Sequence, residues 1–138
     1  MSGGRCAALV ALTAALLCTG PAAARAGELP PPGKSVLTLT VQDSGRSYII
    51  RRGTLVVVNL PSSGGPSWDA PESDAPEVLT PTAHVGGYPA PGPVSAQFRA
   101  ATGGTAHLSA TTDAPCLHSK PHCMIAQRRF RVRILVGE

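Results

Sequence analysis

The chain has 138 residues, which is enough for one small domain and a targeting segment. Its 15 glycines and 14 prolines make up about a fifth of the chain, below the roughly 25–30% at which aperiodic sequences tend to be disordered. The net charge of +4 is modest, and the sequence has neither a phosphate-binding glycine loop nor an RNA-binding aromatic motif, which argues against a nucleic-acid partner.

The first 26 residues have the layout of a signal peptide. Arg5 supplies a positive charge, Ala7 to Leu17 form an apolar stretch, and Ala24-Arg25-Ala26 offers a cleavage site of small residues. Because a spanning helix needs about 20 apolar residues, we expect no membrane span. Lipidation of Cys18 is the alternative to cleavage, although the residues before it are bulky for a lipoprotein signal. The prediction is a secreted or cell-envelope protein with a leader typical of bacteria.

Residues 27–34 are predicted to form a proline-rich linker, because Pro30-Pro31-Pro32 lacks the N–H groups that sheet pairing requires. Residues 35–138 form the predicted domain. About seven short segments of this domain are rich in β-branched residues or alternate between apolar and polar residues, as strands do. They are residues 35–41, 47–50, 54–60, 77–80, 94–100, 105–112 and 129–136.

The last segment has the clearest strand pattern, because arginines alternate with the apolar residues Phe130, Val132, Ile134 and Val136. Residues 54–60 form an almost continuous apolar run, typical of a central strand buried on both faces. Residues 69–76 and 84–92 are expected to be irregular surface loops. Short strands with turns between them, and no helical periodicity, predict an all-β, immunoglobulin-like β-sandwich preceded by the signal peptide.

Trp68 is the only tryptophan of the chain. In a small all-β domain, a single tryptophan on a short strand is most often a core residue between the sheets. We therefore predict that Trp68 plugs the core, with stacking on a ligand as the alternative.

The cysteines Cys116 and Cys123 close an eight-residue segment before the last strand. In an exported chain with two mature cysteines, this spacing predicts a disulfide. The alternative is a metal site, because two thiolates and the imidazoles of His118 and His122 suit zinc or copper. A cupredoxin-like variant would use Cys116, one of these histidines and Met124, with a further histidine, His84, from a distant loop.

No arrangement of residues predicts catalysis. The serines, cysteines and histidines fall in surface loops without a nucleophile-elbow pattern. Asp69, Glu72, Asp74 and Glu77 fall in one polar segment, which is typical of a solvated connection. His107 falls on the polar face of its predicted strand, where we expect it to be solvated. The prediction is a non-enzymatic binding domain without a cofactor.

Arginines recur on one face of the last predicted strand, at Arg129, Arg131 and Arg133. Together with Arg51 and Arg52, they could form a basic stripe for an acidic polymer or a cell-wall anion. The other interpretation is a charged outer face that keeps the strand from aggregating. The sequence leaves both interpretations open.

Several segments in chain order resemble the chagasin family of cysteine-peptidase inhibitors. They are the strand 55–60, the loop from Pro61 to Trp68, Val78-Leu79, Gly86-Gly87 ahead of Phe98-Arg99-Ala100, Gly103 to Leu108, and a final apolar strand. The resemblance spans most of the predicted domain. It implies an immunoglobulin-like sandwich whose three loops at one end enter the cleft of a papain-type cysteine peptidase and block it without reacting.

The resemblance also implies which residues bind the partner. The first loop, which reads Asn-Pro-Thr-Thr-Gly in the family, corresponds here to Ser62, Ser63, Gly64, Gly65 and Pro66. The glycine-rich second loop contributes Gly86, Gly87 and Tyr88, and the third loop contributes Pro115. The third loop reads Asp-Ala-Pro-Cys where the family has Arg-Pro-Trp. The partner would be a protein, and we expect a monomer. A cupredoxin-like metal-binding module and a cell-envelope structural or adhesive domain remain alternatives.

Overall fold

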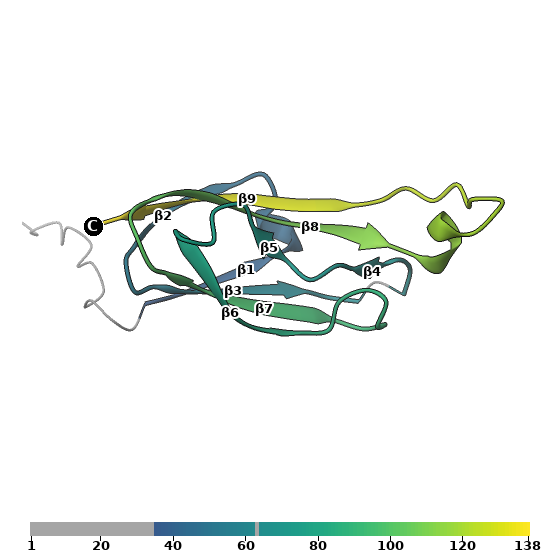
Figure 1. Cartoon of the computed structure of the whole chain (residues 1–138), viewed down its shortest axis with the longest axis horizontal. Helices are drawn as coiled ribbons and strands as arrows, with labels where there is room; N and C mark the ends of the chain where they lie inside the picture. Colours follow the sequence, from purple (N-terminus) through teal and green to yellow (C-terminus); the bar gives the residue numbers. More distant parts are fainter. Residues whose placement is uncertain (1–34, 63) are drawn as a thin grey trace, which may run out of the picture.

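The computed structural model describes residues 35–62 and 64–138, so the predicted signal peptide, the linker and Ser63 lie outside the described residues. The described residues form nine strands and two short 3-10 turns (Figure 1). The strands are β1 Val36–Thr40, β2 Ser47–Arg51, β3 Leu55–Leu60, β4 Ser67–Trp68, β5 Glu72–Ser73, β6 Leu79–Val85, β7 Val94–Ala100, β8 Gly104–Asp113 and β9 Arg129–Gly137; the turns are η1 Val41–Asp43 and η2 Pro115–His118.

The strands form two sheets. The four-stranded sheet has the order β1-β3-β7-β6, and the five-stranded sheet has the order β2-β9-β8-β4, with β5 also paired to β8. The pairs β1–β3 and β2–β9 are parallel, and the others are antiparallel. Figure 1 shows the sheets as two layers, which confirms the predicted all-β, immunoglobulin-like sandwich. In the described part of the chain, no helix has the length and apolar character needed to cross a membrane.

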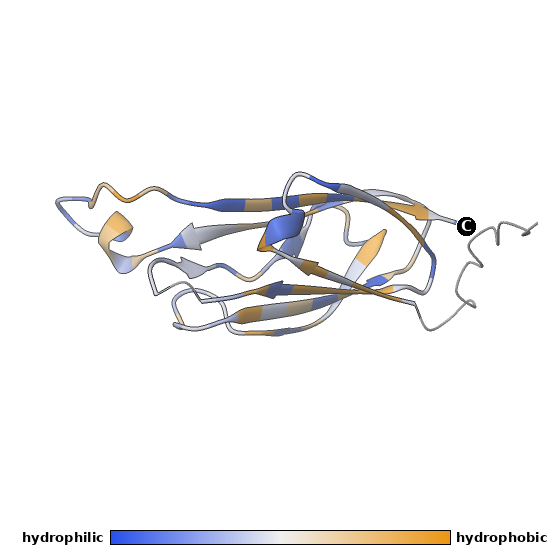
Figure 2. Cartoon of the chain, turned by 180° about the vertical axis from the view of Figure 1, so that it is seen from behind, coloured by the Kyte–Doolittle hydropathy of each residue, from blue (hydrophilic) through white to orange (hydrophobic). Residues whose placement is uncertain are grey.

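The core lies between the sheets because every second residue of the long strands points inward. Figure 2 shows the resulting alternation of hydrophobic and hydrophilic residues along β9. As predicted, Phe130 is buried in the core with Val132, Ile134 and Val136 of β9, and Phe98 of β7 is buried from the opposite sheet. Each large apolar side chain buried in this way contributes roughly 1.5–3 kcal/mol to folding.

The prediction that residues 54–60 are buried on both faces is wrong. Val56, Val58 and Leu60 are buried, but Leu55 is half-buried, as is Val57, and Asn59 is exposed. The strand is central within its sheet, yet a two-layer sandwich covers only one face of each sheet. The apolar residues on the other face of β3 therefore remain near the surface.

The boundaries predicted around residues 77–92 are also wrong. The expected strand 77–80 is β6, which begins at Leu79 and runs to Val85, so that His84 lies in a strand rather than in a loop. Pro81 lies inside β6, where the register shifts between Pro81 and Ala83. An edge strand tolerates proline because one side of its backbone needs no partner. The short strand β5 likewise falls within the expected loop 69–76.

Candidate functional site

Three loops meet at one end of the sandwich. In the four-stranded sheet, Leu60 at the end of β3 pairs with Val94 at the start of β7, which brings the first two of these loops together. Strand β4, which follows the first of them, pairs through Ser67 with Asp113 at the end of β8, where the third begins. We call residues 61–66 the first loop, 86–93 the second loop and 114–128 the third loop, and together they form the loop end. Figure 1 shows the loop end on the right of the molecule, opposite the C-terminus.

The first and second loops are joined through Trp68. Trp68 ends β4, directly after the first loop, and only 2% of its surface is exposed, which confirms the prediction that it plugs the core. Its carbonyl oxygen accepts a hydrogen bond of 2.8 Å from the backbone N–H of Tyr88 in the second loop. The core residue and the second loop thus share a fixed backbone contact.

The second loop depends on two adjacent glycines. Gly86 has a φ of +78° and Gly87 a φ of +114°, conformations that other residues adopt at a cost. A Cβ atom at Gly86 would also collide with the carbonyl oxygen of Pro93, and one at Gly87 would lie 3.0 Å from the backbone nitrogen of Ala70. Both positions therefore require glycine for the backbone to pack closely.

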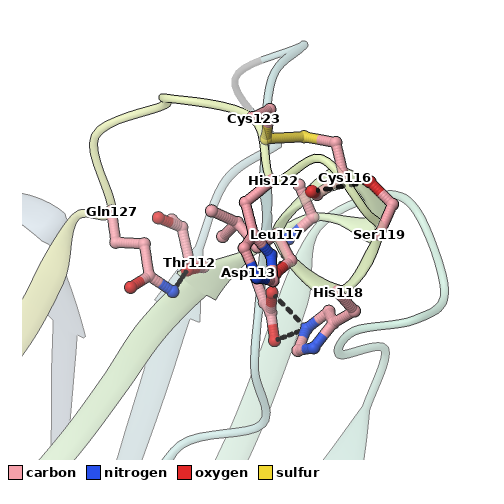
Figure 3. Close-up of polar contacts among 10 residues, drawn as sticks. Thr112, Asp113, Cys116, Leu117, His118, Ser119, His122, Cys123 and Gln127 are labelled. Carbon is pink, nitrogen blue, oxygen red and sulfur yellow. Dashed lines mark hydrogen bonds and ion pairs between the residues drawn. A yellow bond between two sulfur atoms is a disulfide. The ribbon is translucent and has the colours of Figure 1, made fainter.

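The third loop is closed by the predicted disulfide. Cys116 and Cys123 are bonded, with their Cα atoms 5.3 Å apart, and the N–H of Cys123 donates to the carbonyl of Cys116 at 3.1 Å. Figure 3 shows the short ring that results. Inside it, the hydroxyl of Ser119 donates to the Cys116 carbonyl at 2.9 Å, and Nδ1 of His122 donates to the Leu117 carbonyl at 2.7 Å. The ring is therefore held by hydrogen bonds as well as by the disulfide.

A carboxylate and an imidazole connect this ring to β8. Nε2 of His118 lies 2.8 and 2.9 Å from the two carboxylate oxygens of Asp113 (Figure 3). Since a carboxylate only accepts, Nε2 carries the proton. The hydrogen bond from His118 lowers the pKa of Asp113, and the N–H of Ala114, which donates to the same carboxylate at 2.7 Å, lowers it further.

The same histidine contacts the second loop. The ring of His118 stacks on that of Tyr88, with the ring centroids 5.8 Å apart and the ring planes 29° from parallel. Tyr88 is therefore held by Trp68 through its backbone and by His118 through its ring. The three loops form one connected surface.

The base of the third loop is anchored to the core side of β8. Thr112 is buried, and its hydroxyl accepts a hydrogen bond of 2.8 Å from the N–H of Arg128. Its carbonyl accepts another, of 3.0 Å, from the amide of Gln127. The guanidinium of Arg128 lies 5.6 Å from the ring centroid of Trp68, a cation–π distance.

Apolar surface is exposed at this end of the molecule. Met124, next to the disulfide, is fully exposed, and Ile125 is 37% exposed. An apolar groove of about 490 Å³ runs beside the first two loops, with Pro61, Val85 and Pro93 among its lining residues. Surfaces of this kind are typical of sites that contact another protein.

The structure brings the predicted partner-binding residues together at the loop end. Of those described, Ser62, Gly64, Gly65, Gly86 and Pro115 are exposed, while Pro66, Gly87 and Tyr88 are half-buried. The stacking of His118 on Tyr88 and the contact of His118 with Asp113 were not predicted, and Met124 was considered only as a metal ligand. The one available signal was the position of Asp113 shortly before the two cysteines and of His118 between them, and Met124 gave none.

The cupredoxin-like prediction is wrong in its central ligand. Both thiols are used in the disulfide, so Cys116 has no thiolate to offer copper. His84, the second histidine of that prediction, lies in the edge strand β6. Within residues 35–62 and 64–138, no group of three or more His, Cys, Asp or Glu side chains is placed to hold a metal ion.

Two smaller predictions about polar residues also need correction. His107 is not simply solvated: its side chain is 30% exposed, and its Nδ1 donates to Asp74 at 2.8 Å. Asp69, expected in a solvated connection, is half-buried, and burial raises its pKa. Both residues belong to the packed surface of the five-stranded sheet.

No family model and no curated protein matches the sequence, but solved structures resemble the chain. One is the crystal structure of the cysteine protease inhibitor EhICP2 from Entamoeba histolytica, at a TM-score of 0.58 and 15% identity, covering 78% of this chain and 100% of that one. Another is the solution structure of amebosin, at a TM-score of 0.50 and 17% identity, with the same coverage. At these identities the likeness shows the fold, and it agrees with the sandwich that the chagasin resemblance implied.

Proposed function

We propose that this chain is an exported, monomeric inhibitor of papain-type cysteine peptidases, and that the loop end enters the active-site cleft and blocks it without reacting. The observation that carries this proposal is the connection of three exposed loops at one end of a rigid sandwich. Tyr88 is central to it, because this residue contacts Trp68 beside the first loop and His118 in the third.

Preorganisation supports binding through this end. Ordering a mobile loop on association costs conformational entropy, and a loop that is already ordered avoids much of that cost. The disulfide between Cys116 and Cys123 limits the freedom of the third loop. The Asp113–His118 contact holds this loop against β8, and the stacking of His118 on Tyr88 holds it against the second loop. A surface of this kind can bind a partner with little further loss of conformational entropy.

The exposed residues of the loop end are suited to filling the active-site cleft of a peptidase. The loop end presents glycines, prolines and the apolar side chains of Met124 and Ile125. A peptidase cleft binds extended backbone and apolar side chains, so such a surface can occupy it by shape. The likeness in fold to a cysteine protease inhibitor supports the same partner class. Inhibition by obstruction also agrees with the prediction that the chain is not an enzyme.

Titration of papain with the purified chain tests the proposal. With a fluorogenic dipeptide substrate, we expect a dose-dependent, reversible and competitive loss of activity, while the added chain stays uncleaved on a gel. Trypsin, a serine peptidase, should keep its activity under the same conditions. The proposal fails if papain retains full activity at micromolar concentrations of the chain.

A matched pair of substitutions tests the assignment to the loop end. Met124→Glu places a charge on the exposed third loop, and Ile49→Glu places the same charge on an exposed position of β2, away from the loops. Met124→Glu should raise the inhibition constant roughly tenfold or more, the effect of losing about 1.4 kcal/mol of binding energy. Ile49→Glu should leave it unchanged. Equal effects of the two substitutions would move the binding site elsewhere.

Export belongs to the proposal and has its own measurement. When the full chain is expressed in a bacterial host, the mass of the recovered protein should correspond to cleavage after Ala26, leaving Gly27 as the first residue. A product that begins at Cys18 and carries lipid would show that the alternative is correct.

A further inference from the structure

A row of arginines lies on the outer face of the five-stranded sheet. Arg129, Arg131 and Arg133 are exposed on β9, at every second residue, while the residues between them are buried. Alternate residues of a strand are about 6.8 Å apart, so the three cations form a line about 14 Å long. We call these three residues the arginine row.

The arginine row borders a shallow depression of about 320 Å³. Its lining also includes Arg46, Ser47 and His107. These residues come from neighbouring strands of the sheet, since Arg133 pairs with Ser47 of β2 on one side and with His107 of β8 on the other. The depression is thus a basic surface built across three strands.

Nearby carboxylates are already paired with other groups. Asp74 accepts hydrogen bonds from the backbone and the ring of His107, the backbone contact being the largest cause of its lowered pKa. Asp43 lies 3.6 Å from Arg46. By contrast, the arginine row forms no ion pair with any carboxylate in residues 35–62 and 64–138. Asp74 is near enough to Arg131 for the arginine charge to help lower the pKa of Asp74, but no carboxylate of the described residues lies at ion-pair distance from the three guanidinium groups, which leaves them able to contact a ligand.

Protection against aggregation does not account for the arginine row. Charged residues protect an edge strand, whose backbone is unpaired on one side. Strand β9 lies between β2 and β8 and is paired on both sides. In the other sheet, β3 is also internal, and its outward residues are Leu55, Val57 and Asn59. An internal strand of this fold therefore does not need charge on its outer face.

We propose that the arginine row binds a linear polymer of phosphate groups. A single phosphate could contact one or two of the arginines, whereas an extended polyanion can contact all three in line. Guanidinium groups suit phosphate because they donate two parallel hydrogen bonds to its oxygens. Proteins that bind single-stranded nucleic acid stack successive bases on aromatic rings, and the lining of this depression includes no Trp, Tyr or Phe. Its one imidazole, His107, is held by its hydrogen bond to Asp74. This favours a polymer without bases.

The arginine row and the loop end occupy different surfaces. Arg129 follows the third loop directly, and Arg133 lies further along β9 toward the opposite end of the sandwich (Figure 1). A polymer along the face of the sheet would leave Met124 and the disulfide free. The inference is therefore independent of the proposed inhibition.

Binding of the full chain to fluorescently labelled linear polyphosphate, followed by anisotropy at several salt concentrations, tests the inference. Substitution of all three residues of the arginine row by Gln should weaken binding at low salt by tenfold or more. It should also reduce the slope of log affinity against log salt by about two to three, since each phosphate contact contributes about 0.7–0.9 for nucleic acids.

The matched control combines Arg99→Glu with Thr38→Glu, two exposed positions of the four-stranded sheet, and so makes the same change of three in net charge. This control variant should bind polyphosphate within about threefold of the unaltered chain, because salt screens the charges of residues that lie far from the bound polymer. Equal losses in the two variants, or no binding by the unaltered chain, would overturn the inference. Tighter binding to heparin or to single-stranded DNA of equal charge would overturn the choice of a phosphate polymer. Melting curves should show both variants folded, and papain inhibition should be unchanged in both.

Discussion

Strand β9 and the third loop that precedes it are adjacent in the chain but are stabilised in different ways. Four apolar side chains of β9 are buried in the core. No residue of the third loop is buried, and the loop is held by the disulfide, by hydrogen bonds and by the stacking of His118 on Tyr88. Burial determines the conformation of β9, while a small number of specific contacts determine the conformation of the loop that is proposed to meet a partner.

This difference separates stability from binding. A change in the core should reduce the free energy of unfolding and leave the loop end intact in the folded molecules that remain. A change in the loop end should alter binding by more than it alters unfolding.

Phe130→Ala should have the largest effect. The side chain is fully buried, and replacing a buried phenylalanine by alanine typically costs about 3–5 kcal/mol because it removes apolar contact and leaves a cavity. Denaturant unfolding should show this loss. At a temperature where the variant is still folded, its inhibition constant should match that of the unaltered chain. A large change in that constant would mean that the core and the loop end are not separable.

Replacement of both Cys116 and Cys123 by serine should have the next largest effect. Closing a loop of this length reduces the entropy of the unfolded chain by an amount worth roughly 2.5 kcal/mol at 25 °C. The variant should therefore unfold at lower denaturant. It should also inhibit less well, because the third loop must be ordered on binding. A variant that loses stability and keeps full inhibition would show that the disulfide serves the frame alone.

The frame was largely predictable from the sequence because burial leaves a periodic pattern. The alternation in β9 and β7 predicted both strands and their inward faces. The strand predictions were wrong at β6 and β3, where an open edge or an exposed face of a sheet permits residues that the alternating pattern does not anticipate. The predicted strand 77–80 stopped before Pro81, but β6 continues through this proline because it is an edge strand. The apolar outward residues of β3 suggested burial on both faces, but the sandwich covers only one.

The loop end was predictable only in part. The two nearby cysteines, together with the predicted signal peptide, predicted the disulfide, and the chagasin resemblance implied three loops at one end. The stacking of Tyr88 on His118 was not predictable, since these residues are distant in sequence and meet only because β8 lies near β4 and the second loop. The exposure of Met124 was not predictable either, because the loop that contains it has no alternation of apolar and polar residues. Such contacts depend on the tertiary structure and not on local pattern.

Gly86→Ala should have an intermediate effect on stability and a clear effect on binding. The substitution places a methyl group at a residue with a φ of +78° and against the carbonyl oxygen of Pro93. The control is Gly45→Ala, because Gly45 has a similar φ of +85° but open space around it. Gly45→Ala should cost about 1–2 kcal/mol from backbone strain alone. Gly86→Ala should cost more, and it alone should weaken inhibition. If the two variants unfold alike and inhibit alike, then the close packing of the second loop has no functional role.

Acidification should have the smallest effect on the frame and a local effect on the loop end. The hydrogen bond from His118 lowers the pKa of Asp113 below its ordinary value of 3.8, so the folded state favours the carboxylate. The stabilisation is present above that ordinary value and is lost as the pH falls through the lower pKa of the folded protein. Asp43 and Asp74 also have lowered pKa values, so a melting curve would combine all three residues.

The ring resonances of Tyr88 in an NMR titration isolate the contribution of Asp113, because Tyr88 stacks on the histidine that this carboxylate holds. Below about pH 4 these resonances should shift toward the positions that Asp113→Asn shows at neutral pH. In that variant the same acid step should be absent. An acid shift of equal size in Asp113→Asn would assign it to another group. The His118 contact would then be a consequence of the loop conformation that the disulfide imposes, and not a second restraint on it.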